Sequence, residues 1–123
     1  MTHELRHKRY GHTVEEWIAL VPNELEYAEV SLWHIAVAGI EGFGLSGEAL
    51  TDYMRRNIIA LLDAGGVPAR HVANAIHGRG WLPADYGSTP DEIADAVVAE
   101  WLGQGVQPNW HHWFVLASKC LKP

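Results

Sequence analysis

The sequence has a single cysteine, Cys120, and therefore lacks any pair that could form an internal disulfide. It also lacks an N-terminal stretch that combines basic, apolar and small residues as a secretory signal does. No apolar run approaches the ~20 residues that a membrane-spanning helix needs. These absences predict a cytoplasmic protein with no membrane segment.

The common motifs of catalysis and cofactor binding are also missing. The chain contains no G-x-S-x-G, no H-E-x-x-H and no acid-rich loop with the spacing of a calcium site. These absences argue against the enzyme classes that the motifs define, although catalytic groups can also converge in space without a sequence signature. We therefore expect no cofactor, and the balance favours a non-catalytic protein.

Positive charge is scarce in this chain. Lys and Arg number 9 against 15 Asp and Glu, which gives a net charge of -6. This balance argues against a dedicated nucleic-acid binder. The basic residues of the middle of the chain are Arg55, Arg56, Arg70 and Arg79. Arginines spread over such a length are typical of a solvated face, and the alternative is that they meet an acidic partner or a phosphate.

The chain does contain enough apolar material for one folded domain. With 48% hydrophobic residues and 6 tryptophans among 123 residues, it can bury roughly 60–70% of its unfolded surface without disulfides. Residues 1–12 mix charges with little apolar content, which is typical of a flexible N-terminal tail. We expect residues 13–123 to form a single globular domain.

The clearest element is an amphipathic helix that begins after Ser46. Its apolar residues recur at steps of three and four, so they share one face of a helix. They are Leu50, Tyr53, Met54, Ile58, Leu61 and Leu62. Ser46 suits the N-cap position, and Gly65 and Gly66 followed by Pro68 predict where the helix stops.

Two further helices are predicted by capping boxes, in which a threonine and a glutamate three residues later accept from each other's backbone N–H groups. Thr13 and Glu16 open a helix that Pro22 ends. Thr89 and Glu92 open another, with a proline at its first position. Both starts are local signals, so we expect them to form wherever these helices pack.

The strand predictions rest on composition. Residues 30–38 form a short apolar run with β-branched residues, and we expect a core strand, although periodicity cannot separate it from a buried helix. Residues 110–116 are expected to be a closing strand, 77–80 a turn, and 67–76 either a strand or a short helix. This order predicts a small α+β domain with two or three strands packed with three or more helices; the alternative is a mostly α-helical bundle.

A glycine-rich loop precedes the clearest helix. Residues 42–47 match G-x-G-x-x-G, the pattern of a dinucleotide-binding loop. No acidic residue follows at the spacing that a ribose needs, and a tight turn is the simpler interpretation. Free N–H groups at the start of the helix could instead hold an anion, with nearby arginines as counter-charges. The residues of this candidate anion site are Gly44, Ser46, Gly47, Arg55 and Arg56.

Histidines could form a metal site only if the fold brings them together. The adjacent His111 and His112 project to opposite faces of a strand, so both cannot bind one ion without help from elsewhere. His34 could join either of them across a sheet. The simpler interpretation places His34 in the core or at a sheet edge.

Trp110 and Trp113 suit core packing or, in part, an exposed anchor for a partner. We expect the chain to be a non-catalytic interaction module, such as an adaptor, an accessory subunit or an inhibitor-type binder. Its expected partner is another protein, and self-association is left open. The alternative function is the binding of a small ligand or anion at the loop of residues 42–48.

Overall fold

The computed structural model describes residues 5–74, 78–104 and 112–120. Its helical elements are α1 (Val14–Leu20), the 3₁₀ helix η1 (Val21–Glu26), α2 (Leu32–Val37), the π-helix η2 (Ala38–Gly42), α3 (Gly47–Asp63), α4 (Pro90–Gly103) and the 3₁₀ turn η3 (Ala117–Lys119). Its strands are β1 (Val30–Ser31), β2 (Gly66–Asn74), β3 (Gly78–Pro83) and β4 (Trp113–Leu116). They make the predicted small α+β single domain and not the alternative helical bundle, with four strands in place of two or three.

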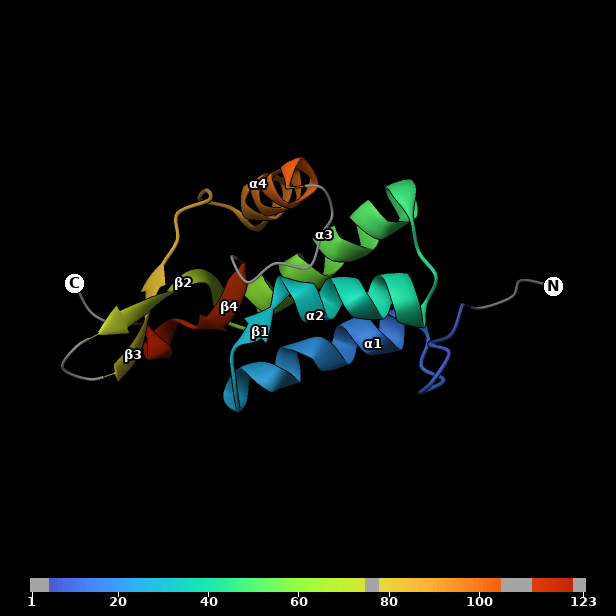
Figure 1. Cartoon of the computed structure of the whole chain (residues 1–123), viewed down its shortest axis with the longest axis horizontal. Helices are drawn as coiled ribbons and strands as arrows, with labels where there is room; N and C mark the ends of the chain where they lie inside the picture. Colours follow the sequence, from blue (N-terminus) through green and yellow to red (C-terminus); the bar gives the residue numbers. More distant parts are fainter. Residues whose placement is uncertain (1–4, 75–77, 105–111, 121–123) are drawn as a thin grey trace.

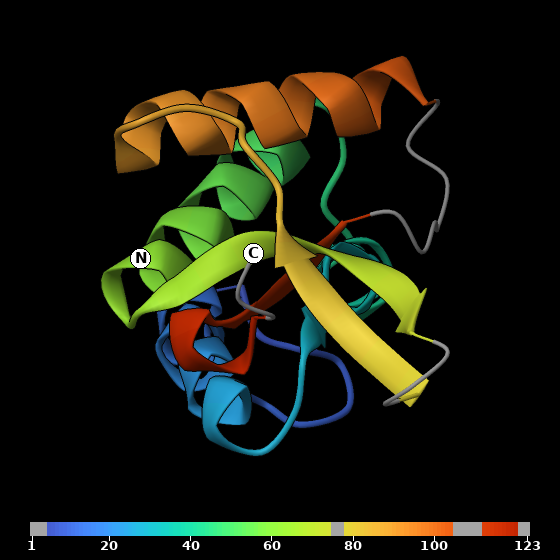
Figure 2. The same ribbon diagram turned by 90° about the vertical axis from the view of Figure 1, so that its left-hand side faces the viewer.

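The four strands form one antiparallel sheet in the order β1-β4-β2-β3. The late strand β4 lies between two earlier ones, because Phe114 pairs with Val30 on one side and with Pro68 on the other. Figure 1 shows the sheet toward one end of the molecule and the N-terminal turn at the other, with α1, α2 and α3 extending between them. Figure 2 shows α4 lying above the strands, next to α3.

Helix α3 supplies much of the core, as its periodicity predicts. The large apolar residues of its inner face are at most 6% exposed: Leu50, Tyr53, Met54, Ile58 and Leu61. They pack with Trp101 of α4 and Phe114 of β4, each 1% exposed. Burying one such side chain contributes about 1.5–3 kcal/mol, so this face accounts for a large share of the hydrophobic stabilisation.

The predicted helix ends are confirmed, with two differences in detail. At α4 the Thr89 side chain accepts from the Glu92 backbone N–H, but the Glu92 side chain accepts from the Ser88 N–H and not from that of Thr89, so half of the predicted capping box forms. Ser46 occupies the N-cap of α3, but its side chain makes no capping hydrogen bond, and Gly65 takes a positive φ of 93° just after the helix. In α1, Thr13 and Glu16 form both hydrogen bonds of the capping box. The α-helix ends before Pro22, yet the chain continues as η1 because a proline needs no N–H partner in a first helical turn.

The prediction of a core strand over residues 30–38 is wrong for most of its length. Only β1 is a strand, and the chain then turns into α2 and η2. The Ser31 side chain accepts a hydrogen bond from the His34 backbone N–H and so caps the new helix. Leu32, Ile35 and Ala36 are buried at helical spacing. Tertiary burial therefore overrides the strand preference of the β-branched residues.

Three other segments can be compared with their predictions. Residues 67–74 belong to strand β2, which decides between the two structures left open for this segment. The predicted turn at 77–80 is wrong for residues 78–80, which pair with β2 as the start of β3. The closing strand is confirmed as β4, which begins at Trp113. Residues 75–77 and 110–111 lie outside the described part of the chain.

The segment of residues 5–12 makes specific contacts, although the sequence predicts a flexible tail over residues 1–12. Arg6 forms an isolated β-bridge with Thr13, and the Lys8 backbone N–H donates to the Gly42 carbonyl at 2.9 Å. The His7 ring stacks on Trp17 with 4.7 Å between ring centroids. These contacts hold this N-terminal turn against the start of α1 and the end of η2.

We expect Gly39→Ala to lower the free energy of unfolding by about 1–3 kcal/mol, because overpacking forces buried groups to shift. A Cβ at Gly39 would lie 2.6 Å from an atom of the Tyr53 ring. Gly103→Ala is the matched control, since beyond its chain neighbours and the backbone of its own helix no described atom lies within 4 Å of the new Cβ. Urea denaturation of both variants measures the effect. Equal stability of the two would contradict the close packing of η2 on α3.

Candidate functional site

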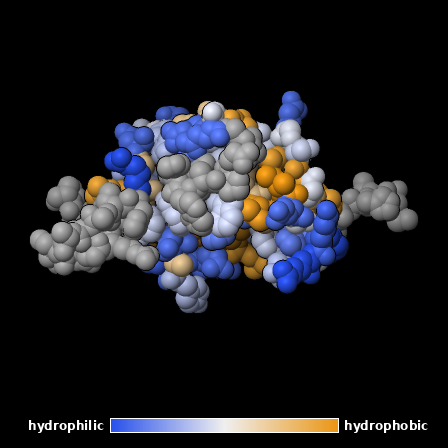
Figure 3. Space-filling view, viewed as in Figure 1, coloured by the Kyte–Doolittle hydropathy of each residue, from blue (hydrophilic) through white to orange (hydrophobic). Residues whose placement is uncertain are grey.

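An apolar hollow opens between η2, the start of α3 and the end of α4. It has a volume of about 570 Å³ and is lined by Ile40, Leu45, Ser46, Gly47, Glu48, Leu50, Thr51 and Leu102. We call it the Leu102 hollow. Ile40 and Leu102 are 39% and 44% exposed, which is high for large apolar side chains. Figure 3 shows hydrophobic residues gathered between the end of α2 and the start of α3, where this hollow lies.

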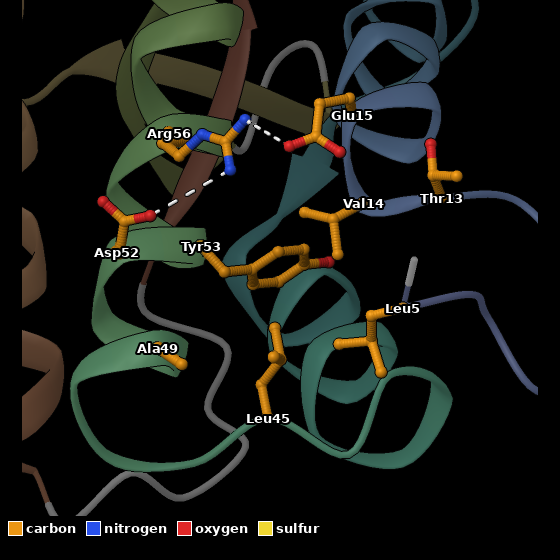
Figure 4. Close-up of a pocket in the computed structure, with 9 residues that line it drawn as sticks. All are labelled: Leu5, Thr13, Val14, Glu15, Leu45, Ala49, Asp52, Tyr53 and Arg56. Carbon is orange, nitrogen blue, oxygen red and sulfur yellow. Dashed lines mark hydrogen bonds and ion pairs between the residues drawn. The ribbon is translucent and has the colours of Figure 1, made fainter. Parts of the chain in front are cut away.

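A second hollow lies between α1 and α3 and is shown in Figure 4. It has a volume of about 310 Å³ and is lined by Leu5, Thr13, Val14, Glu15, Leu45, Ala49, Asp52, Tyr53 and Arg56. We call it the Tyr53 hollow. Because Leu45 lines both hollows, they meet at the loop between η2 and α3.

The Tyr53 ring forms the floor of its hollow. The residue is 1% exposed, and its hydroxyl donates to the Ile35 carbonyl of α2 at 3.0 Å. Burial raises the pKa of Tyr53 far above its usual value, so the phenol stays neutral at any physiological pH. In Figure 4, Val14 and Leu45 lie on either side of this ring, so apolar side chains border it.

Charged side chains stand at the rim of the Tyr53 hollow. Arg56 Nη2 lies 3.2 Å from Glu15 Oε1 of α1, and its Nη1 lies 4.0 Å from Asp52 Oδ2 on the preceding turn of α3. Hydrogen bonds from its own backbone and from Arg56 lower the pKa of Glu15. The two carboxylates outnumber the one cation, and exposed ion pairs of this kind contribute little to stability because solvent screens them. A positively charged partner could therefore compete for them.

The residues of the predicted anion site do not converge on one point of the structure. Gly44 and Gly47 have positive φ values of 70° and 57°, and Ser46 and Gly47 line the Leu102 hollow. The arginines do not contribute their charge to this loop, because Arg55 binds Asp91 and Asp95 of α4 and Arg56 binds Glu15 and Asp52. The positive charge expected at the loop is thus neutralised along the sides of α3.

The predicted metal ligands occupy different environments. His34 is exposed on α2, whereas His112 is buried, with its Nε2 2.7 Å from Glu100 Oε1. The Tyr86 hydroxyl donates to the same Glu100 oxygen at 2.9 Å. Within the described residues, no group of three or more His, Cys, Asp or Glu side chains could hold a metal ion. His111 lies outside the described part.

Of the two tryptophans expected to serve core packing or, in part, as an exposed anchor, the structure describes one. Trp113 is half-buried in β4, with its ring centroid 5.4 Å from that of Trp81 in β3. It lies beside Tyr86 and His112 in a narrow gap of the surface. Trp110 lies outside the described residues. The sequence analysis did not single out Leu45 and Leu102 as lining residues of a hollow. The one signal for them was their position, since Leu45 is an apolar residue in a loop and Leu102 an apolar residue near the end of a helix.

We expect the stability of the protein to fall between pH 10 and about 12, partly through Tyr86. Burial and the neighbouring Glu100 raise the pKa of Tyr86 to about 12 in the folded state. Because this pKa is raised, its stabilising contribution is complete below the unfolded value of about 10 and is lost as the pH rises through 12. Because phenylalanine has no hydroxyl to ionise, Tyr86→Phe should remove the part of the stability loss at high pH that comes from Tyr86.

Urea denaturation from pH 9 to 12 measures the effect. The free-energy difference between wild type and Tyr86→Phe should shrink as the pH rises. Tyr27→Phe is the control at pH 9. Because Tyr27 is 83% exposed, loss of its hydroxyl should change the free energy of unfolding little at this pH. A difference that stays constant over the whole range would contradict the proposed environment of Tyr86.

Comparisons with protein-family models, curated proteins and solved structures found no match to this chain. Among the described residues, no helix is long and apolar enough to cross a membrane. The case for a function therefore rests on the geometry of the two hollows and the charges around them.

Proposed function

We propose that this chain is a non-catalytic, cytoplasmic interaction module that binds a basic amphipathic segment of another protein. The observation that carries the proposal is the meeting of the Leu102 hollow and the Tyr53 hollow at Leu45, with carboxylates at their rims. The apolar face of the partner segment would fill the hollows, and its basic residues would contact the carboxylates.

Apolar exposure supports the first half of this proposal. Ile40 and Leu102 leave a substantial part of their side chains in water on the same side of the molecule. Contiguous apolar surface of this kind commonly marks a binding site on soluble proteins. An amphipathic helix binds such a groove through anchors spaced three and four residues apart. Burial of each large anchor would contribute about 1.5–3 kcal/mol before the costs of association.

Charge supports the second half. Glu15 and Asp52 stand at the Tyr53 hollow and Glu48 at the Leu102 hollow, whereas Arg56 is the single cation among the lining residues. The chain as a whole carries a net charge of -6. An acidic rim attracts basic partners and disfavours acidic ones. This is why we favour a basic segment over an apolar segment without charge.

The alternative of anion binding at the loop of residues 42–48 has less support. Arg55 and Arg56 are both engaged with carboxylates of other helices, Asp95 of α4 and Glu15 of α1. Glu48 lines the hollow beside the loop and would repel an anion there. The same acids that favour a basic partner therefore weaken this alternative.

The test is a selection of random peptides of about 12 residues, roughly three helical turns, against the immobilised protein. We expect the enriched peptides to combine bulky apolar residues at helical spacing with Lys or Arg. Leu102→Asp should weaken their binding at least tenfold, because it places a charge in the apolar hollow. Calorimetric titration of the synthetic peptides measures this affinity.

Leu20→Asp is the matched control for that substitution. Leu20 is 45% exposed, close to the 44% of Leu102, but it lies on α1 outside both hollows. It should leave peptide binding unchanged. Equal binding by wild type and Leu102→Asp would contradict the proposal, as would the absence of any enriched sequence. Sedimentation of the free protein separates peptide binding from self-association through the same surface.

A further inference from the structure

A third hollow lies against the N-terminal turn, on the side of α1 and α2. Its volume is about 350 Å³, and it is lined by His7, Lys8, Arg9, Tyr10, Trp17, His34, Val37, Ala38, Glu41 and Gly42. We call it the His7 hollow. It shares no lining residue with the Leu102 hollow or the Tyr53 hollow. A ligand here would therefore contact other residues than a partner at the two paired hollows.

The His7 ring is fixed from several directions. It stacks on Trp17 at an interplanar angle of 14° and meets Phe43 edge-on at 5.3 Å between centroids. Its Nδ1 accepts hydrogen bonds from the backbone N–H groups of Arg9 and Tyr10 at 3.1 and 3.3 Å. Because Nδ1 is an acceptor, the neutral ring carries its proton on Nε2. These contacts give the turn a defined shape.

The turn also requires a glycine on the facing element. A Cβ at Gly42 would lie 2.2 Å from His7 Nε2, so no other residue allows this approach without a shift. Gly42 ends the π-helix η2, and π-helical turns occur frequently at functional sites. At the His7 hollow, a π-helical turn and a histidine fixed by its neighbours therefore meet.

The charge of the His7 hollow is opposite to that of the rest of the molecule. Lys8 and Arg9 are both exposed, and neither forms an ion pair in the part of the chain that the structure describes. The Arg9 guanidinium lies 5.9 Å from the centroid of the Tyr10 ring. Glu41 is the single acid among the lining residues. Two unneutralised cations beside aromatic rings suit a ligand that is both anionic and flat.

We propose that the His7 hollow binds a small aromatic anion, a planar ring that carries one phosphate or carboxylate group. Its ring would pack against Tyr10 and Trp17, and its anionic group would be held by Lys8 and Arg9. Figure 3 shows strongly hydrophilic residues gathered where the N-terminal turn lies, next to the hydrophobic surface of the helices. This juxtaposition of charge and apolar surface is what such a ligand needs.

The test is an NMR titration with phenyl phosphate, benzoate and adenosine 5′-monophosphate. Inorganic phosphate serves as the anion without a ring, and adenosine as the ring without an anion. We expect at least one aromatic anion to shift the signals of Tyr10 and Trp17 and to bind at least tenfold more tightly than either control. Phenyl phosphate against benzoate decides between a phosphate and a carboxylate.

Lys8→Ala and Arg9→Ala should each weaken that binding about tenfold, since each removes one exposed cation. Arg70→Ala, at an exposed arginine outside the His7 hollow, should leave it unchanged. The amide spectra of the free variants check that they remain folded. The proposal is overturned if no aromatic anion shifts these signals, if inorganic phosphate binds as tightly, or if Lys8→Ala binds like the wild type.

Discussion

The contact between Tyr53 and the segment of α2 and η2 is the constraint on which the rest of the structure depends. The ring lies so close to Gly39 that a Cβ there would meet it at 2.6 Å, and its hydroxyl binds the Ile35 carbonyl. Packing and a buried hydrogen bond thus fix α3 against α2. The same ring is the floor of the Tyr53 hollow, so one residue links the core to the proposed interaction surface.

Electrostatics then divides the surface into two regions of opposite character. Along α3, Arg55 and Arg56 bind carboxylates of α4 and α1, which uses the positive charge that the sequence places in this helix. At the paired hollows, the three lining carboxylates Glu15, Asp52 and Glu48 stand against the one cation Arg56, and this excess of negative charge is the basis for proposing a basic partner. At the N-terminal turn, Lys8 and Arg9 remain exposed beside aromatic rings and favour an anion. The two proposed sites therefore differ in the sign of the charge around them.

The successes and failures of the sequence predictions follow from how local each signal is. The capping box of Thr13 and Glu16 and the periodicity of α3 act within a few residues, and both are confirmed. The run at residues 30–38 is apolar on every side, so its conformation depends on what covers it. Spacing could not predict that Arg55 binds Asp91 and Asp95 and not the glycine loop, because these acids lie about forty residues away along the chain.

The sequence by itself determined the single α+β domain, the three main helices with their starts and the scarcity of positive charge, because these follow from composition and short-range spacing. Only the tertiary structure decided that Leu45 joins two hollows and that residues 5–12 fold onto Trp17. It also decided that His112 lies buried beside Glu100. Among the described residues, no three His, Cys, Asp or Glu side chains come together in a way that could hold a metal ion. Such groupings join segments distant in the sequence, and the packing of the whole core sets the distances between them.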